Sequence, residues 1–357
     1  MSAESLSPSA DFSIELNHII EDFFARGIQN AASASPYYGQ LWQEMFRLVS
    51  SGGKRLRPKM TILAYEAFGG KDVSSILPIA AAQELLHVSM LIHDDIIDRD
   101  YSRYGVDNVA GSYDKLYESL VTDKTDRLHY AHSAALLAGD LLISGSYQLT
   151  IESKISPDMI IEVQKLLSKS MFDVAGGELI DTESSFRELG AIKSETVALY
   201  KTASYSFVGP LLIGAVLANA SDKDKDALRL FAESLGVAFQ IRDDIMGVFG
   251  DEAETGKSTT GDIREGKHTL MVEQFYQTAS DENKVTFDQY FGDNGITSEE
   301  IDVIKRLLDE SGAKDKAEQA ISELEAKARE ALDSLNLNEE YKEKFQTLIT
   351  LSIRRNK

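Results

Sequence analysis

The sequence predicts an all-α protein that folds as a single large helical bundle. Only 6 of its 357 residues are proline, and over long stretches apolar residues recur at intervals of three and four, the spacing of an amphipathic helix. No run of alternating apolar residues is bounded by hairpin turns, which is the signal of a half-buried strand. A hydrophobic content of 43% is ample for the core of such a bundle.

Breaks that contain glycine or a polar pair divide the chain into helical stretches. They lie at Gly52-Gly53, Gly69-Gly70, Gly111-Ser112, Ser221-Asp222, Gly250–Gly266 and Gly292–Gly295. Residues 297–334 alternate acids, bases and apolar positions, as amphipathic surface helices do. No linker rich in proline and serine separates folding units. We therefore expect residues 1–12 to form a disordered N-terminus and residues 13–357 to form one helical domain.

Two stretches carry almost no polar face. Residues Ile79–Ile92 are apolar nearly all round, interrupted mainly by Gln83, Glu84 and His87, and Ser206–Ala220 is similarly apolar. Helices of this kind belong in the middle of a bundle rather than on its surface.

The composition excludes several classes of function. The chain has no cysteine, so disulfides, thiolate zinc sites and a cysteine nucleophile are excluded. A net charge of −21 argues against nucleic acid and anionic lipid as partners. The N-terminus lacks the basic and apolar regions of a signal peptide, and no uninterrupted apolar run approaches the roughly 18–20 residues that span a bilayer. We expect a soluble, cytoplasmic protein with no membrane span.

The first apolar stretch leads into a cluster of carboxylates, His93-Asp94-Asp95-Ile96-Ile97-Asp98. Asp94 and Asp98 are one helical turn apart, so they project from one face. Carboxylates that converge at the end of a buried helix cannot all stay ionised without a cation. Magnesium prefers such oxygen ligands and typically keeps positions open for phosphate oxygens. A solvated acidic helix end is the alternative, and the apolar helix before the cluster argues against it.

A second carboxylate pair is built in the same way. The apolar segment Leu235–Arg242 leads into Asp243-Asp244, and Gln240 lies on their face one turn earlier. Two such helix ends imply a site that faces inward between them, as in other helix-bundle enzymes. The glycine-rich segment that follows carries Lys257 and Lys267, which suits a mobile lid over a phosphate.

The densest basic cluster before the C-terminus is the segment Gly-Gly-Lys-Arg-Leu-Arg-Pro, residues 52–58. It can be explained as a helix boundary, because glycine ends helices and Pro58 suits a first turn. It can also bind a diphosphate, since Arg57 offers a planar fork and Lys54 a point charge.

Together these motifs resemble the trans-polyprenyl diphosphate synthases. The residues that carry the resemblance are the 52–58 segment, His87, His93-Asp94-Asp95 with Asp98, Lys201-Thr202, Phe239-Gln240 with Asp243-Asp244, and Gly256-Lys257. Their order and spacing match from about residue 50 to residue 270. The resemblance implies an isoprenoid synthase fold with a central cavity and a homodimer. It also implies a prenyltransferase that joins isopentenyl diphosphate head to tail to an allylic diphosphate, with two to three Mg²⁺ ions.

The resemblance also implies roles for individual residues. The metal ligands would be Asp94, Asp98 and Asp243, with Asp95 supporting and with Asp244 and Asp262 acting through water. Lys54, Arg57 and His87 would bind isopentenyl diphosphate, and Arg103, Lys201, Lys257 and Lys267 would surround the allylic diphosphate. The catalytic residues would be Lys201, with Thr202 and Gln240 as the oxygens that stabilise the carbocation. Glu178 and Asp181 stand where the family often has Gln and Asp, and the basic end Arg354–Lys357 resembles the family's closing tail.

Three features depart from the family pattern. Tyr104 stands where a second arginine usually helps to bind isopentenyl diphosphate. Gly247 replaces the last aspartate of the second motif. The chain is also longer than expected between Gly105 and the Ala138-Gly139-Asp140 segment, and residues 112–127 have no assigned role.

Rival interpretations explain less of the sequence. A terpene cyclase shares the helical architecture but has no use for Lys54, Arg57 and His87. A non-catalytic subunit of a heteromeric synthase should have lost one aspartate motif, whereas this chain keeps the start of both. A calcium-binding or structural role leaves the basic residues unexplained.

The resemblance places the determinants of product length at Ser89 and Met90. An aromatic side chain there would block the floor of the product tunnel, and a serine and a thioether leave it partly open. We therefore expect geranylgeranyl diphosphate or a somewhat longer product.

Overall fold

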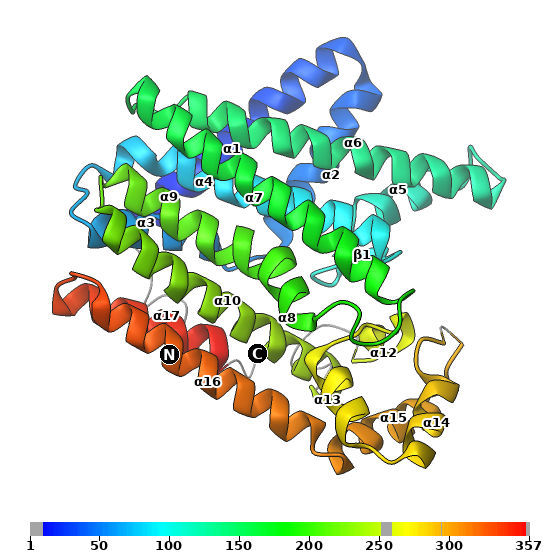
Figure 1. The fold of residues 1–357 in the computed structure, drawn as a ribbon. Helices are drawn as coiled ribbons and strands as arrows, with labels where there is room; N and C mark the ends of the chain where they lie inside the picture. The colour runs from blue at the N-terminus through cyan, green and yellow to red at the C-terminus, as the bar shows by residue number, and fades with distance from the viewer. Residues whose placement is uncertain (1–9, 251–258, 294, 355–357) are drawn as a thin grey trace. The chain divides into compact units, whose positions relative to one another are not determined.

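The computed structural model describes residues 10–250, 259–293 and 295–354, and within these ranges the chain is helical apart from one short hairpin (Figure 1). In that hairpin, strand β1 (Ser102–Arg103) pairs antiparallel with β2 (Val106–Asp107). The predicted all-α class is confirmed. The hairpin escaped prediction because strands of two residues carry no alternating pattern.

The described residues group into two compact units. We call residues 10–165 with 213–219 the N-terminal unit, and residues 166–212 with 220–354 the C-terminal unit. The grouping leaves the expectation of one domain over residues 13–357 a prediction. Residues 10–12, expected to be disordered, begin the first helix.

The helices of the N-terminal unit are α1 (Ala10–Ala34), α2 (Pro36–Ser51), α3 (Leu56–Ala67), α4 (Val73–Ile97), α5 (Val109–Tyr117) and α6 (Lys124–Ile151). Those of the C-terminal unit are α8 (Ser194–Val197), the π-helix η2 (Ala198–Val208), α10 (Asp222–Phe249), α12 (Gly261–Glu265), α13 (Leu270–Thr278), α14 (Asp281–Tyr290), α15 (Ser298–Glu310), α16 (Ala313–Ser334) and α17 (Glu339–Ile353). Two helices, α7 (Pro157–Ser184) and α9 (Gly209–Leu217), contribute residues to both units.

Helix α4 is the core of the N-terminal unit, as its apolar sequence predicts. It packs against α1, α3 and α6, and most of its side chains are buried, including Gln83 and Glu84. Glycines on α6 make its approach possible, because a Cβ on Gly139 would lie 2.1 Å from the ring of His93. The end of α4 that carries the carboxylates is therefore held against a second helix.

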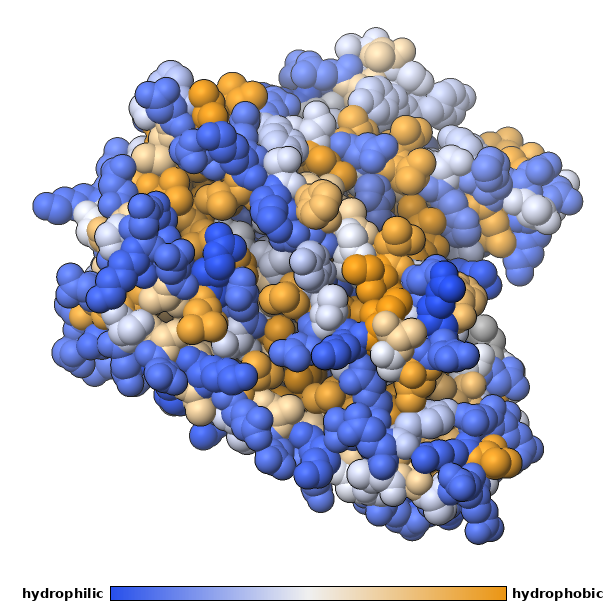
Figure 2. All heavy atoms as spheres, viewed as in Figure 1, coloured by the Kyte–Doolittle hydropathy of each residue, from blue (hydrophilic) through white to orange (hydrophobic). Residues whose placement is uncertain are grey.

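Two helices of the described chain, α4 and α6, are long and apolar enough to cross a membrane by length and composition alone. In α4, 72% of the most apolar window is buried inside the protein, which is typical of a core helix. In α6 the share is 50%, because Leu136, Leu137 and Ile151 are exposed. Figure 2 shows apolar residues among hydrophilic ones on the visible face.

In the C-terminal unit α10 packs against η2, α16 and α17 (Figure 1). Its core includes an edge-to-face contact between Phe231 and Phe345, with ring centroids 5.3 Å apart. The predicted amphipathic region is α15 followed by α16, and Thr297 and Glu300 form a capping box at the start of α15.

The unassigned residues 112–127 form the end of α5, a turn and the start of α6. Arg127 closes this turn, because its Nε lies 2.6 Å from Asp114 Oδ1 and its guanidinium donates to the Val121 carbonyl. Tyr113 and Tyr117 stack on each other beside Tyr130 of α6. The extra length is thus a short helix tied to its neighbour.

The π-helix η2 carries Lys201 and Thr202, and it lies unusually close to α7. A Cβ on Gly177 of α7 would lie 2.2 Å from the backbone nitrogen of Lys201. Backbone cannot yield as a flexible side chain can. Gly177 thus makes the close approach of η2 to α7 possible.

We predict that Gly177→Ala lowers the free energy of unfolding by about 1–3 kcal/mol or more, the usual cost of overpacking. Gly176→Ala is the matched control, because a Cβ on Gly176 meets nothing within 4 Å. Alanine is favoured over glycine inside a helix by about 0.5–1 kcal/mol, so this variant should be unchanged or more stable. Thermal and urea unfolding of both variants measures the difference, and equal stabilities would contradict the steric argument.

Candidate active site

The basic loop between α2 and α3 is folded onto α4 by one arginine. Arg55, at a backbone φ of 51°, donates from Nη1 to Glu84 Oε1 and from Nη2 to the Val49 carbonyl, both at 2.7 Å. Lys54 remains exposed and Arg57 is partly buried. Arg55 thus anchors the loop that carries Lys54 and leads into Arg57 in the first turn of α3, two of the predicted ligands of isopentenyl diphosphate.

Glu84 is a residue of the candidate site whose pairing the sequence did not reveal. Its side chain is 3% exposed, and it is the partner that holds the basic loop. An acid within the apolar stretch 79–92 was the available signal, since buried carboxylates are almost always paired.

His87 lies one turn after Glu84 on α4, among three arginines. Its pKa is well below the usual value of 6.5, chiefly because of burial and further because of Arg57, Arg103 and Arg55. The imidazole is therefore neutral near pH 7 and offers a hydrogen bond rather than a charge.

The first carboxylate cluster divides into two roles. Asp94 of α4 and Asp98, the C-cap residue of that helix, are partly exposed. Asp95 is buried and accepts hydrogen bonds from Arg103, including one of 2.7 Å from Nε. Burial raises the pKa of Asp95 to about 6, against the opposing effect of Arg103. Arg103 also lies 3.4 Å from Asp94 Oδ2. Asp95 thus positions Arg103, and the predicted supporting role toward a metal stays a prediction.

Tyr104 stands at the hairpin turn with a backbone φ of 55°. Its ring lies against Gly52, where a Cβ would be 3.0 Å from Tyr104 Cγ. Burial raises the pKa of the phenol, and among its charged neighbours Glu84 raises it while Arg103 and Arg57 lower it. The tyrosine therefore lies beside the basic loop.

The two predicted determinants of product length differ in exposure. Ser89 is fully buried and its hydroxyl donates to the Leu86 carbonyl at 2.7 Å, whereas Met90 is partly exposed. Their role stays a prediction.

In the C-terminal unit, Lys201 of η2 is paired with carboxylates of α7. Its Nζ lies 2.6 Å from Asp181 Oδ2 and 3.1 Å from Glu178 Oε2. These two acids are one helical turn apart, so α7 presents both to the same lysine. Glu178 and Asp181, which stand where the family often has Gln and Asp, are therefore the partners of Lys201 in the structure.

Thr202 and Gln240 form one polar chain with the second carboxylate pair. The Thr202 hydroxyl donates to Gln240 Oε1, and Gln240 Nε2 donates to Asp244 Oδ1 at 2.7 Å. The orientation of the amide is thus set at both ends. The structure thus brings Thr202 and Gln240 together, and their role toward a carbocation stays a prediction.

The second pair lies in a crowded acidic environment. The pKa of Asp244 is well above its usual range, first because of burial and then because of Asp262, Asp243 and Asp181. Asp244 is thus a partly buried carboxylate with three further carboxylates near it. A hard divalent cation stabilises such an arrangement, so the donor set fits Mg²⁺.

The remaining predicted basic residues are Lys267, Lys257 and those of the C-terminal end. Lys267 Nζ lies 3.0 Å from Glu265 Oε2 and 3.9 Å from Asp262 Oδ1. Lys257 and residues 355–357 lie outside the described residues, and Arg354 caps the end of α17.

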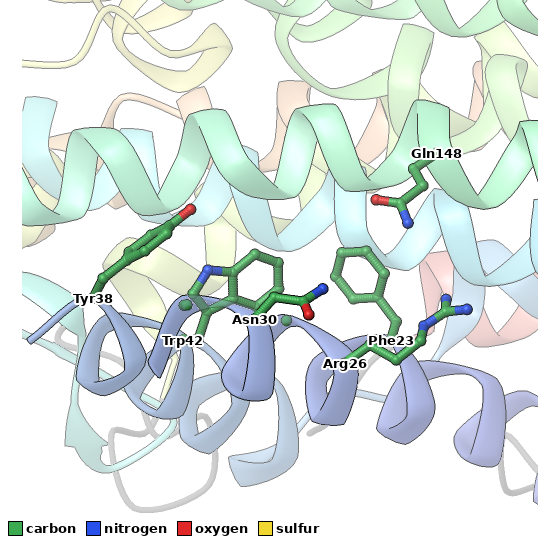
Figure 3. A pocket seen from close by; sticks show the side chains of 8 residues that line it. Phe23, Arg26, Asn30, Tyr38, Trp42 and Gln148 are labelled. Atoms are coloured by element: carbon green, nitrogen blue, oxygen red, sulfur yellow. The ribbon is translucent and has the colours of Figure 1, made fainter. Parts of the chain in front are cut away.

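A separate pocket of about 200 Å³ lies among α1, α2 and α6 (Figure 3). Its walls include Phe23 and Trp42, whose ring centroids are 5.6 Å apart, with Arg26, Asn30, Tyr38 and Gln148. None of the predicted site residues lines it, so it is no part of the candidate active site.

Comparison with known proteins agrees with the motifs. The sequence model of the polyprenyl synthetase family matches residues 40–310. A geranylgeranyl diphosphate synthase of Methanosarcina mazei is 33% identical over 306 residues, covering 83% of this chain and 84% of that protein.

Solved structures show the same fold. A geranylgeranyl pyrophosphate synthase of Corynebacterium glutamicum, complexed with isoprenyl diphosphate and magnesium, has a TM-score of 0.91 at 29% identity, covering 98% of this chain and 100% of that one. A polyprenyl synthase of Caulobacter crescentus, complexed with calcium and isoprenyl diphosphate, has a TM-score of 0.82 at 25% identity, covering 100% of this chain and 98% of that one.

The lowered pKa of His87 predicts how stability depends on pH. The unfolded chain takes up a proton below about pH 6.5 that the folded chain excludes, so the stabilisation present above this pH is lost as the pH falls. The slope from this group is at most about 1.4 kcal/mol per pH unit. His87→Gln, which cannot titrate, should remove that slope, whereas the exposed His18→Gln should retain it. Urea unfolding between pH 5 and 8 measures the slopes, and parallel curves for wild type and His87→Gln would refute the prediction.

Proposed function

Because this chain belongs to the polyprenyl synthetase family and is therefore a prenyltransferase, we propose that it joins isopentenyl diphosphate head to tail to an allylic diphosphate. The product is geranylgeranyl diphosphate or a somewhat longer chain. The observation that carries the proposal is the presence of both carboxylate clusters together with cations suited to two diphosphates. A cyclase would need only one diphosphate site.

Isopentenyl diphosphate binds at the basic loop of the N-terminal unit. Lys54 and Arg57 supply charge, with the guanidinium able to hold two phosphate oxygens at once. His87 adds a neutral hydrogen bond, and Tyr104 a phenolic one. The ion pair of Arg55 with Glu84 supports this role, because it keeps the loop in place without a ligand.

The allylic diphosphate is held by cations and by Mg²⁺. Arg103, Lys201, Lys257 and Lys267 surround the diphosphate, and Asp94, Asp98 and Asp243, with Asp95 and Asp244, hold two to three ions. When bound, Mg²⁺ supplies the positive charge that stabilises the departing diphosphate. The bound magnesium of the Corynebacterium glutamicum relative supports this choice of metal.

The residues of this chain then guide the condensation. The C–O bond of the allylic substrate breaks, and the oxygens of Thr202 and Gln240 stabilise the cation that is left. The double bond of isopentenyl diphosphate attacks this carbon and forms the new C–C bond. A proton is then lost to the departing diphosphate, and apolar residues of α4 keep the growing tail dry.

Product length, assembly and location complete the proposal. Ser89 and Met90 leave room for a long product, as the geranylgeranyl synthases among the relatives suggest. The chain forms a homodimer, which would cover the exposed Leu136, Leu137 and Ile151 of α6, and acts in the cytoplasm.

The direct test is product sizing after incubation with labelled isopentenyl diphosphate, Mg²⁺ and dimethylallyl, geranyl or farnesyl diphosphate. We expect products of about four isoprene units or more. Asp94→Asn and Asp243→Asn keep the shape of the side chain but remove a charged ligand, so turnover should fall by about 100-fold to 1000-fold or more.

The control is Asp309→Asn on the exposed face of α15, which should leave turnover unchanged. All three variants should melt close to wild type. A hydrocarbon product formed without isopentenyl diphosphate would favour a cyclase. Normal rates in both ligand variants would exclude the two-cluster metal site.

A second prediction concerns Tyr104. A charge-assisted hydrogen bond to a diphosphate contributes about 1.5–3 kcal/mol, or roughly tenfold to a hundredfold in affinity. Tyr104→Arg should therefore lower the KM for isopentenyl diphosphate and barely change that for the allylic substrate. The left-handed backbone at position 104 is no obstacle to this substitution. Tyrosine and arginine both carry a Cβ, so the strain is the same for each.

The matched control is Tyr104→Phe, which removes only the phenol and should raise the KM for isopentenyl diphosphate slightly. Steady-state kinetics with each substrate varied in turn measures both constants. A change confined to the allylic substrate would show that Tyr104 does not contact isopentenyl diphosphate.

A further inference from the structure

On the face of α10 that carries the second carboxylate pair, the residue one turn later has no side chain. Gly247 follows Asp243 by four residues and Asp244 by three, so it lies on the same face of the helix. The carboxylate of Asp262 fills the space that a side chain would take there. A Cβ on Gly247 would lie 2.6 Å from Asp262 Oδ2 and 3.5 Å from its Cγ, which is too close for a real side chain.

The segment that carries Asp262 is fixed by contacts of its own. Ile263 is buried, and its carbonyl accepts a hydrogen bond of 2.9 Å from the Gly292 nitrogen. The Asp262 carbonyl accepts a bond of 3.0 Å from the Lys267 nitrogen. Because the backbone of α12 is anchored in this way, a side chain at position 247 would displace the carboxylate of Asp262 rather than the whole helix.

We propose that Gly247 is a positioning residue: by having no side chain, it lets Asp262 of α12 place a carboxylate on the face of α10 after Asp243. A separate segment thereby supplies the acidic group that α10 lacks at this position. The metal-binding part of this idea rests on the proposed function, and the steric part does not.

A glycine at position 247 could instead serve only the end of α10. In that case alanine would be harmless or would stabilise the protein, since it is the better helix former. The two explanations differ in what Gly247→Ala should do to metal binding: the proposal predicts weaker binding, and the alternative predicts no change.

The first experiment titrates Mg²⁺ in the presence of inorganic diphosphate and follows the melting temperature of the full chain. Gly247→Ala and Asp262→Asn should each raise the half-saturating Mg²⁺ concentration at least about tenfold, as expected for a lost charged contact. The control is Gly261→Ala, next to Asp262, because a Cβ on Gly261 meets nothing within 4 Å. It should titrate like wild type.

Two combined variants test the connection between the residues. If Gly247 acts only through Asp262, the double variant Gly247→Ala/Asp262→Asn should bind Mg²⁺ no more weakly than Asp262→Asn alone. Gly247→Asp/Asp262→Ala, which moves the carboxylate onto α10, should recover most of the lost affinity. Wild-type affinity in Gly247→Ala, or losses that add in the double variant, would overturn the proposal.

A crystal structure of metal-free Gly247→Ala separates this proposal from the proposed function. We expect the carboxylate of Asp262 to be displaced by at least about 1 Å relative to wild type, since the new Cβ takes its space. A carboxylate that stays in place would overturn the proposal whatever the metal does. A wild-type protein that does not respond to Mg²⁺ would count against the metal part of the proposed function, with the displacement still deciding the role of Gly247.

Discussion

In the N-terminal unit the buried acids of the candidate active site are carried by α4, a mostly buried helix, and the surrounding segments depend on how each buried charge is compensated. On α4, Glu84 and Asp95 lie among apolar side chains that form the core of the N-terminal unit. A buried carboxylate without a partner would cost several kcal/mol, and each of these two is paired with an arginine. Glu84 is paired with Arg55 of the basic loop, and Asp95 is paired with Arg103 of strand β1.

These pairs organise the loops as well as neutralise the acids. Arg55 fixes the basic loop before α3, and Arg103 fixes the hairpin after α4. Lys54 and Tyr104 therefore lie on segments that are hydrogen-bonded to α4. The same principle operates in the C-terminal unit, where Lys201 is held by two acids of α7. A site organised in this way is largely formed before substrate arrives, which lowers the ordering cost of binding.

Close approach of backbones is the second constraint, and glycines meet it. Gly177 lets η2 lie against α7, and Gly236 lets α10 lie against η2, where a Cβ would be 2.5 Å from that of Ala203. The polar chain from Thr202 through Gln240 to Asp244 joins η2 to α10, so it depends on this short separation. Packing of small residues thus sets the geometry of polar groups several residues away.

The sequence by itself determined the helical class, the central place of α4 and the identity of most candidate residues. Helical periodicity is a local property, and residues three or four apart, such as Asp94 and Asp98, share a face whatever surrounds them. Only the tertiary structure decided which charge meets which. Asp94 and Asp95 are alike in sequence, yet Asp95 alone is buried against Arg103 because the hairpin folds back on that side of α4. Two further contacts, of Arg55 with Glu84 and of Gly247 with Asp262, likewise join residues distant in sequence. The π-helix at Lys201 depends on packing. Such contacts follow from how helices pack in three dimensions, and no local pattern encodes them.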